Sequence, residues 1–152
     1  MTTFWTDISL MHDVDDLVIA RAVAAAMGVR LASVAIVPHG TDAALEAGRV
    51  AEVVVQRQDL RAFGEGGSWP IALAITTASD RPVADLAALR AVAAGIGVPL
   101  IANIAADGQD MFRVVFPDGH APVRLLDDDE NPELTADDRR RLARYDQPAR
   151  AA

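Results

Sequence analysis

Two copies of one short pattern, 69 residues apart, constrain the fold of this chain more than any other feature. Arg21–Leu31 reads RAVAAAMGVRL and Arg90–Leu100 reads RAVAAGIGVPL, so that eight of the eleven positions are identical. Each copy has the composition of an Ala-rich helix, then a glycine that suits a helix C-terminus, then a run that opens a strand. Two such helices can also look alike by chance. In either case the chain is predicted to contain two helix-to-strand units.

Strand-like segments stand on both sides of each copy, so each copy is expected to form the middle of a β-α-β unit. Alternation of apolar and polar residues predicts strands, and apolar residues at intervals of three and four predict helices. The two units are expected to comprise strand Phe4–Leu10, helix Val14–Met27, strand Val29–Val37, strand Ile71–Thr77, helix Val83–Ala94 and strand Val98–Ile104.

The segment between the two units predicts two further elements. Asp42–Ala47 is expected to form a short helix and Val50–Gln58 a strand. One longer helix over Asp42–Leu60 is the alternative, but three consecutive valines and a glycine oppose it.

The C-terminal part of the chain predicts a hairpin and a last helix. Asp118-Gly119 lies between two strand-like runs, Met111–Phe116 and Ala121–Leu126, which is a strong hairpin signal. The last helix is expected to run from Thr135 to about Tyr145, with Asp138 completing a box-like N-terminal cap.

Together these elements predict one α+β domain over residues 1–146, followed by a flexible tail over residues 147–152. We expect a mixed sheet with the two helices of the repeated units on one face and the hairpin and last helix appended. A ferredoxin-like strand order satisfies this arrangement. Helices on opposite faces would instead indicate a doubly wound sheet.

Charge and composition exclude several classes of function. The net charge of −8 opposes nonspecific binding to nucleic acid or to an anionic membrane, whereas a basic protein would be attracted. All 14 basic residues are arginine, so no lysine is available for Schiff-base chemistry. Without cysteines there is no thiol nucleophile, thiolate metal ligand or disulfide, and the expected compartment is a reducing cytoplasm.

One candidate site lies between the end of the first predicted strand and the start of the first predicted helix. His12, Asp13 and Asp16 cluster there, and His39 ends the next strand, so a parallel arrangement would bring these residues to one sheet edge. Imidazole and carboxylate groups of this kind could bind Zn²⁺, Mn²⁺ or Mg²⁺. The alternative is structural, with Asp13 as the N-cap of the helix and the following aspartates favoured by the helix dipole.

A second candidate site is the acidic run Asp127, Asp128, Asp129 and Glu130. Four adjacent carboxylates on an acidic chain form a concentrated negative surface, which would accelerate association with a basic partner. The alternative is that the run only increases solubility.

The sequence therefore predicts a non-catalytic acidic interaction module, such as an immunity or antitoxin-like inhibitor of a basic partner protein. The alternative is a small metal-dependent hydrolase that uses His12, Asp13, Asp16 and His39. No nucleophile elbow or paired-carboxylate pattern is present, and this favours the first hypothesis. No cofactor is predicted, and self-association is compatible with either hypothesis.

Overall fold

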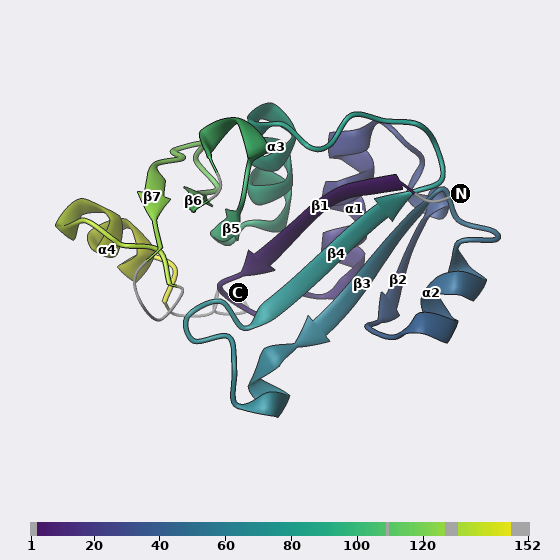
Figure 1. Ribbon diagram of the computed structural model, residues 1–152, viewed down its shortest axis with the longest axis horizontal. Coiled ribbons are helices and arrows are strands. Elements are labelled where there is room, and N and C mark those ends of the chain that lie inside the picture. The colour runs from purple at the N-terminus through teal and green to yellow at the C-terminus, as the bar shows by residue number, and fades with distance from the viewer. Residues whose placement is uncertain (1–2, 109, 127–130, 147–152) are drawn as a thin grey trace, which may run out of the picture.

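The computed structural model describes residues 3–108, 110–126 and 131–146, and shows four helices and a mixed sheet of seven strands (Figure 1). The predicted tail, residues 147–152, lies outside these ranges. The strands are β1 Thr3–Leu10, β2 Val34–Pro38, β3 Val53–Asp59, β4 Ile71–Thr77, β5 Leu100–Ala102, β6 Met111–Val115 and β7 Val123–Leu125. The helices are α1 Asp16–Met27, α2 Thr41–Ala47, α3 Leu86–Ile96 and α4 Ala136–Ala143. Within the described residues, none of these helices has both the length and the apolar character needed to span a membrane.

The sheet has the strand order β2-β3-β4-β1-β5-β6-β7. The central strand β1 is antiparallel to both β4 and β5, and β4 is antiparallel to β3. The inner order β3-β4-β1-β5, with α1 and α3 as crossovers, is the ferredoxin-like order. β2 extends one edge parallel to β3, and the β6–β7 hairpin extends the other. The predicted α+β class with a mixed sheet is therefore confirmed.

The two helices of the sequence repeat, α1 and α3, lie together on one face of the sheet, behind it in Figure 1. They approach closely at Gly95, because a Cβ atom added there would lie 2.8 Å from the Cβ atom of Ala22. Each helix ends in a left-handed glycine, Gly28 with φ of 70° and Gly97 with φ of 81°. The shared sheet face and the glycine end of each helix are as the repeat predicts. The doubly wound alternative, with the helices on opposite faces, is wrong.

The repeat ends in structural terms just after these glycines. Residues Leu31–Ser33 form a short 3₁₀ turn before β2, whereas the equivalent Leu100 is already the first residue of β5. The first unit carries the chain across three strand spacings, from β1 to β2, and the second carries it across only two, from β4 to β5. Because the first connection crosses one more strand spacing, it needs the extra residues of the 3₁₀ turn. The strand predicted over Val29–Val37 therefore begins only at Val34, five residues after its predicted start.

Alternation along β4 shows how the two faces of the sheet differ. Ile71, Leu73 and Ile75 are fully buried and belong to the core beneath α1 and α3. Ala72 and Ala74 point to the opposite face, because successive side chains of a strand alternate between faces. That face therefore has small side chains in its centre.

The remaining helices lie on this opposite face, near its two edges. The β2–α2–β3 connection joins neighbouring parallel strands, and a right-handed crossover places α2 on the side away from α1. This placement accounts for Val54, which points to that side and is only 3% exposed. At the other edge, Leu142 of α4 packs with Val114 and Phe116 of the β6 region.

The attachment of α4 depends on one buried carboxylate. Asp138 is 1% exposed, accepts a 2.6 Å hydrogen bond from Nε of Arg124, and forms the predicted capping box with Thr135. Burial alone would raise the pKa of Asp138, but the hydrogen bonds from Arg124 and Thr135 outweigh it and hold the pKa below its ordinary value.

Candidate functional site

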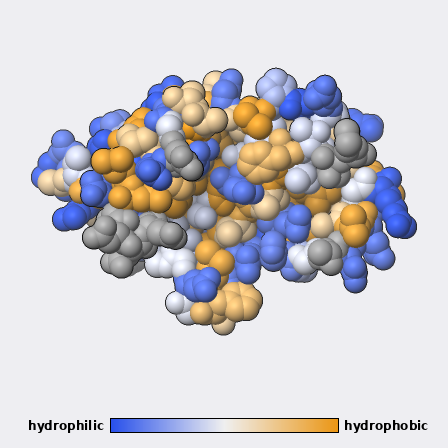
Figure 2. All heavy atoms as spheres, viewed as in Figure 1, coloured by the Kyte–Doolittle hydropathy of each residue, from blue (hydrophilic) through white to orange (hydrophobic). Residues whose placement is uncertain are grey.

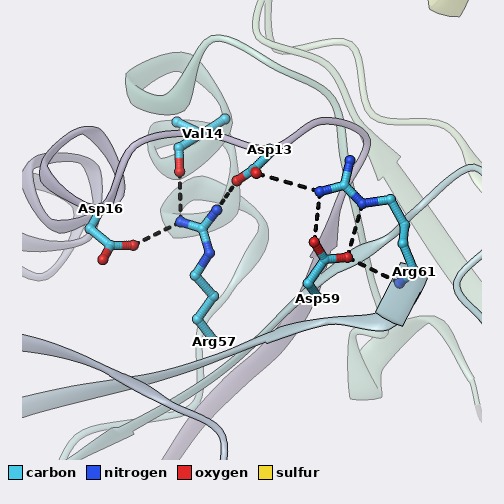
Figure 3. Close-up of polar contacts among 6 residues, drawn as sticks. All are labelled: Asp13, Val14, Asp16, Arg57, Asp59 and Arg61. Carbon is cyan, nitrogen blue, oxygen red and sulfur yellow. Dashed lines mark hydrogen bonds and ion pairs between the residues drawn. The ribbon is translucent and has the colours of Figure 1, made fainter. Parts of the chain in front are cut away.

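The aspartates predicted as metal ligands or caps form ion pairs with β3 (Figure 3). Arg57 donates from Nη1 to the carbonyl oxygen of Val14 at 2.6 Å and to Oδ1 of Asp16 at 2.7 Å, and from Nη2 to Asp13. Arg57 thus joins the start of α1 to β3. Asp13 is not the N-cap, because α1 begins at Asp16 and Asp15 holds the cap position without a side-chain hydrogen bond.

A second arginine completes this ion-pair cluster. Arg61 contacts the other oxygen of Asp13 at 3.4 Å and binds Asp59 through two side-chain hydrogen bonds of 2.7 and 2.9 Å. The hydrogen bonds from Arg61 hold the pKa of the Asp59 carboxyl below its ordinary value. Charge-assisted hydrogen bonds of this kind engage both oxygens of Asp13 and one oxygen of Asp16, so a metal ion would have to compete with the arginines.

The two predicted histidine ligands direct their side chains away from the cluster, although His12 directly precedes Asp13 and the backbone N–H of His39 donates to the carbonyl oxygen of Arg57. His12 directs Nε2 to the carbonyl oxygen of Tyr145, after α4. His39 follows β2, which is separated from β1 by β3 and β4, or roughly 14 Å at 4.8 Å per strand spacing. The structure therefore does not bring His12, Asp13, Asp16 and His39 together, and within its described residues no group of three such side chains could hold a metal ion.

The second predicted site, Asp127, Asp128, Asp129 and Glu130, lies outside the described residues. Asn131, the first described residue after it, lines a hollow of about 700 Å³ next to Trp69 and the glycines of the β3–β4 connection.

A site that the sequence did not indicate lies on the sheet face between α2 and α4. No described helix crosses the middle of this face in Figure 1, and Figure 2 shows apolar side chains running across it between polar ones. A hollow of about 440 Å³ opens there. Its floor is formed by small side chains of β4 and β1, and its sides by Gln56, Gln58, Ile101, Asn103 and Phe112.

This central hollow adjoins one further hollow toward each end of β1. It shares Ser9 and Ile101 with the hollow beside Trp69, and it shares Asp7 and Asn103 with a third hollow of about 460 Å³ beside Phe4. We call the three together the sheet groove. It follows β1 from one end to the other.

Asp7 is the charged residue at the centre of the sheet groove. Within the described residues, its carboxylate has no hydrogen bond and no ion pair, although many other aspartates are paired with arginine. Asp7 is exposed to solvent, and the partial burial of its carboxyl raises its pKa above the ordinary value. The carboxylate is thus in an environment that disfavours its charge without supplying a compensating cation.

The groove is lined by the three residue types of a hydrolytic triad, but they are not arranged as a triad. Asp7, Ser9 and His39 all line the central hollow. A nucleophile and its base must be within hydrogen-bond reach, roughly 3 Å. His39 follows β2, roughly 14 Å across the sheet from Ser9 on β1, so these residues do not form a nucleophile–base pair.

Two signals in the sequence could have indicated the groove. Asp7 is the only charged residue in the strand Phe4–Leu10, and the strand Ile71–Thr77 alternates large apolar residues with Ala72, Ala74 and Thr76. The second pattern indicates a strand with large apolar side chains on one face and small side chains on the other.

The ion-pair cluster leads to a prediction about metal binding. Adding Mg²⁺, Mn²⁺ or Zn²⁺ is expected to leave the melting temperature unchanged. A metal ion raises the melting temperature only if it binds the native state, and in the native state the aspartates of the cluster are paired with arginines. Calorimetry with and without each metal checks this. A rise that is lost in His39→Ala would contradict the prediction and restore the metal site.

The environment of Asp7 leads to a prediction about pH. Because the folded-state pKa is raised at an exposed carboxyl, ionised Asp7 is expected to lower stability slightly at neutral pH, and this cost is relieved as the pH falls through that pKa toward the unfolded value of about 3.9. Asp7→Asn should therefore be more stable than the wild type at pH 7, with the difference shrinking toward pH 4. Urea denaturation of both proteins at several pH values measures it, with Asp80→Asn as the control. A variant less stable than the wild type at pH 7 would show that Asp7 has a structural role.

Comparison of the chain with family models, with curated proteins and with solved structures finds no match. The case for a function therefore rests on the residues and geometry of the chain itself.

Proposed function

We propose that this protein is a non-catalytic acidic interaction module that binds a basic partner protein, in the manner of an immunity or antitoxin-like inhibitor. The observation that carries the proposal is the sheet groove, an uncovered concave surface with an unpaired carboxylate at its centre. Such a surface favours a partner that supplies both apolar contacts and a cation.

The charges around the groove support this proposal. Asp7, Glu65 and Asp85 line its three hollows, and no arginine does so within the described residues. Arg124, which pairs across strands with Phe112 of the groove, is held by Asp138. The groove thus offers negative charge to a partner, and the overall charge of −8 acts in the same direction at longer range.

The metal-dependent hydrolase is not supported in the same way. Its four residues are distributed among an ion-pair cluster, the end of α4 and the edge of the groove. No described observation favours a reaction over binding.

The first test of this function adds a positive charge inside the groove. Ala74→Arg places a guanidinium on the groove floor, and Ala87→Arg makes the same change on the exposed side of α3. When tagged proteins are recovered from cells of the source organism, mass spectrometry should find basic proteins with the wild type and Ala87→Arg, but not with Ala74→Arg. Loss with both variants, or with neither, would place the interaction surface elsewhere.

The acidic run provides a second test once a partner is known. Changing Asp127, Asp128, Asp129 and Glu130 together to Asn and Gln should slow association and flatten its salt dependence, because exposed charges act mainly on encounter and are screened beyond roughly 10 Å at 0.1 M salt. Stopped-flow measurements at several salt concentrations check this. An unchanged rate and salt slope would leave the run as a solubility feature.

A further inference from the structure

We infer that the sheet groove binds an extended segment of the partner, with basic side chains at alternate positions and one of them placed over Asp7. This inference rests on the proposed function and specifies its ligand. It is carried by the course of the groove, by the short gap beside β1 and by the acidic residues that line the groove.

The course of the groove matches one extended chain. Its three hollows follow β1, which has eight residues, from Ser9 at one end to Phe4 at the other. At roughly 3.3 Å per residue, a segment of about seven residues spans this length.

The sheet has a short gap beside β1. β5 pairs with β1 only over Ile8–Leu10, and beyond Ala102 the chain turns into the short 3₁₀ helix Ala105–Asp107. The hollow of about 460 Å³ lies between the first half of β1 and residues Asn103–Ala106, where a longer β5 would have continued. The backbone N–H of Ala84, in the loop before α3, donates to the carbonyl oxygen of Trp5 at 2.9 Å. The gap therefore lies at Thr6 and Asp7, between this hydrogen bond and the Ile8–Ala102 pair.

An acidic residue lines each of the three hollows, and one of the three, Asp85, also caps α3 by accepting a 2.9 Å hydrogen bond from the backbone N–H of Ala88. Glu65 lines one end hollow, Asp7 the centre, and Asp85 the other end hollow. In an extended chain every second side chain points to the same side, so alternate basic residues would all face the floor. A second copy of this chain is a poor occupant, because two proteins of charge −8 repel each other.

The test uses two labelled peptides of equal composition, each with four arginines and three alanines. In one peptide the residues alternate, and in the other the arginines are contiguous. Fluorescence anisotropy at 0.15 M salt should show the alternating peptide binding about tenfold more tightly than the contiguous one, since only its arginines all face the groove floor. Asp7→Asn should weaken it by about tenfold, the loss of one charge-assisted contact. Asp80→Asn, an equal change of net charge outside the groove, should weaken it by less than about twofold.

Amide chemical shifts locate the peptide independently of affinity. The shifts that change should be those of the groove, including Ser9, Ala74 and Asn103. Melting curves establish that each variant is folded, and Ala74→Arg provides a second way to block the groove.

Three outcomes would overturn the inference. Equal weakening by Asp7→Asn and Asp80→Asn would mean that the peptide is held only by overall charge. Equal binding of the two peptides would remove the extended register. If the peptides fail to bind while Ala74→Arg still releases a captured basic protein, the proposed function stands and the groove recognises a folded surface instead.

Discussion

The contact between α1 and α3, where Gly95 leaves room for Ala22, determines how the rest of the molecule is arranged. Because both crossovers run on the same side of the sheet, most of the large buried side chains of β1, β3 and β4 lie on that side, and Val54 of β3 is an exception. The other face is left to α2 and α4, which have seven and eight residues. Helices this short are roughly 10–12 Å long and cannot cover a sheet of seven strands. The uncovered groove is therefore a direct result of helix packing on the far side.

Two aspartates differ in whether neighbouring groups compensate the charge of their carboxylates. Asp138 is almost fully buried, yet Arg124 and the start of α4 keep its pKa low. Asp7 is less buried, yet nothing in the described chain compensates its charge, and its pKa is raised. Seven arginines are engaged in ion pairs elsewhere. The carboxylate of Asp7 is exposed and makes no ion pair within the described residues.

The elements whose signals are local could be predicted from the sequence. The glycine ends of the repeated helices, the turn at Asp118-Gly119 and the capping box of Thr135 and Asp138 each depend on neighbouring residues, and each is where the sequence placed it. The role of Asp13 was missed because its partner, Arg57, is 44 residues away. The groove was missed for a similar reason, since Asp7, Ala74 and Asn103 come together only through the strand order. A single sequence without aligned relatives contains no direct signal for such distant pairings.

The central position of β1 has a consequence for how the chain is made. Its partners are the last strands of the inner sheet, so that Leu10 pairs with Ile71 on one side and with Leu100 on the other. At a synthesis rate of roughly 5–20 residues per second, both edges of β1 wait several seconds for their partners to emerge. During that time an apolar strand with two open edges is exposed near the ribosome, which is the condition under which nascent chains pair wrongly or need a chaperone.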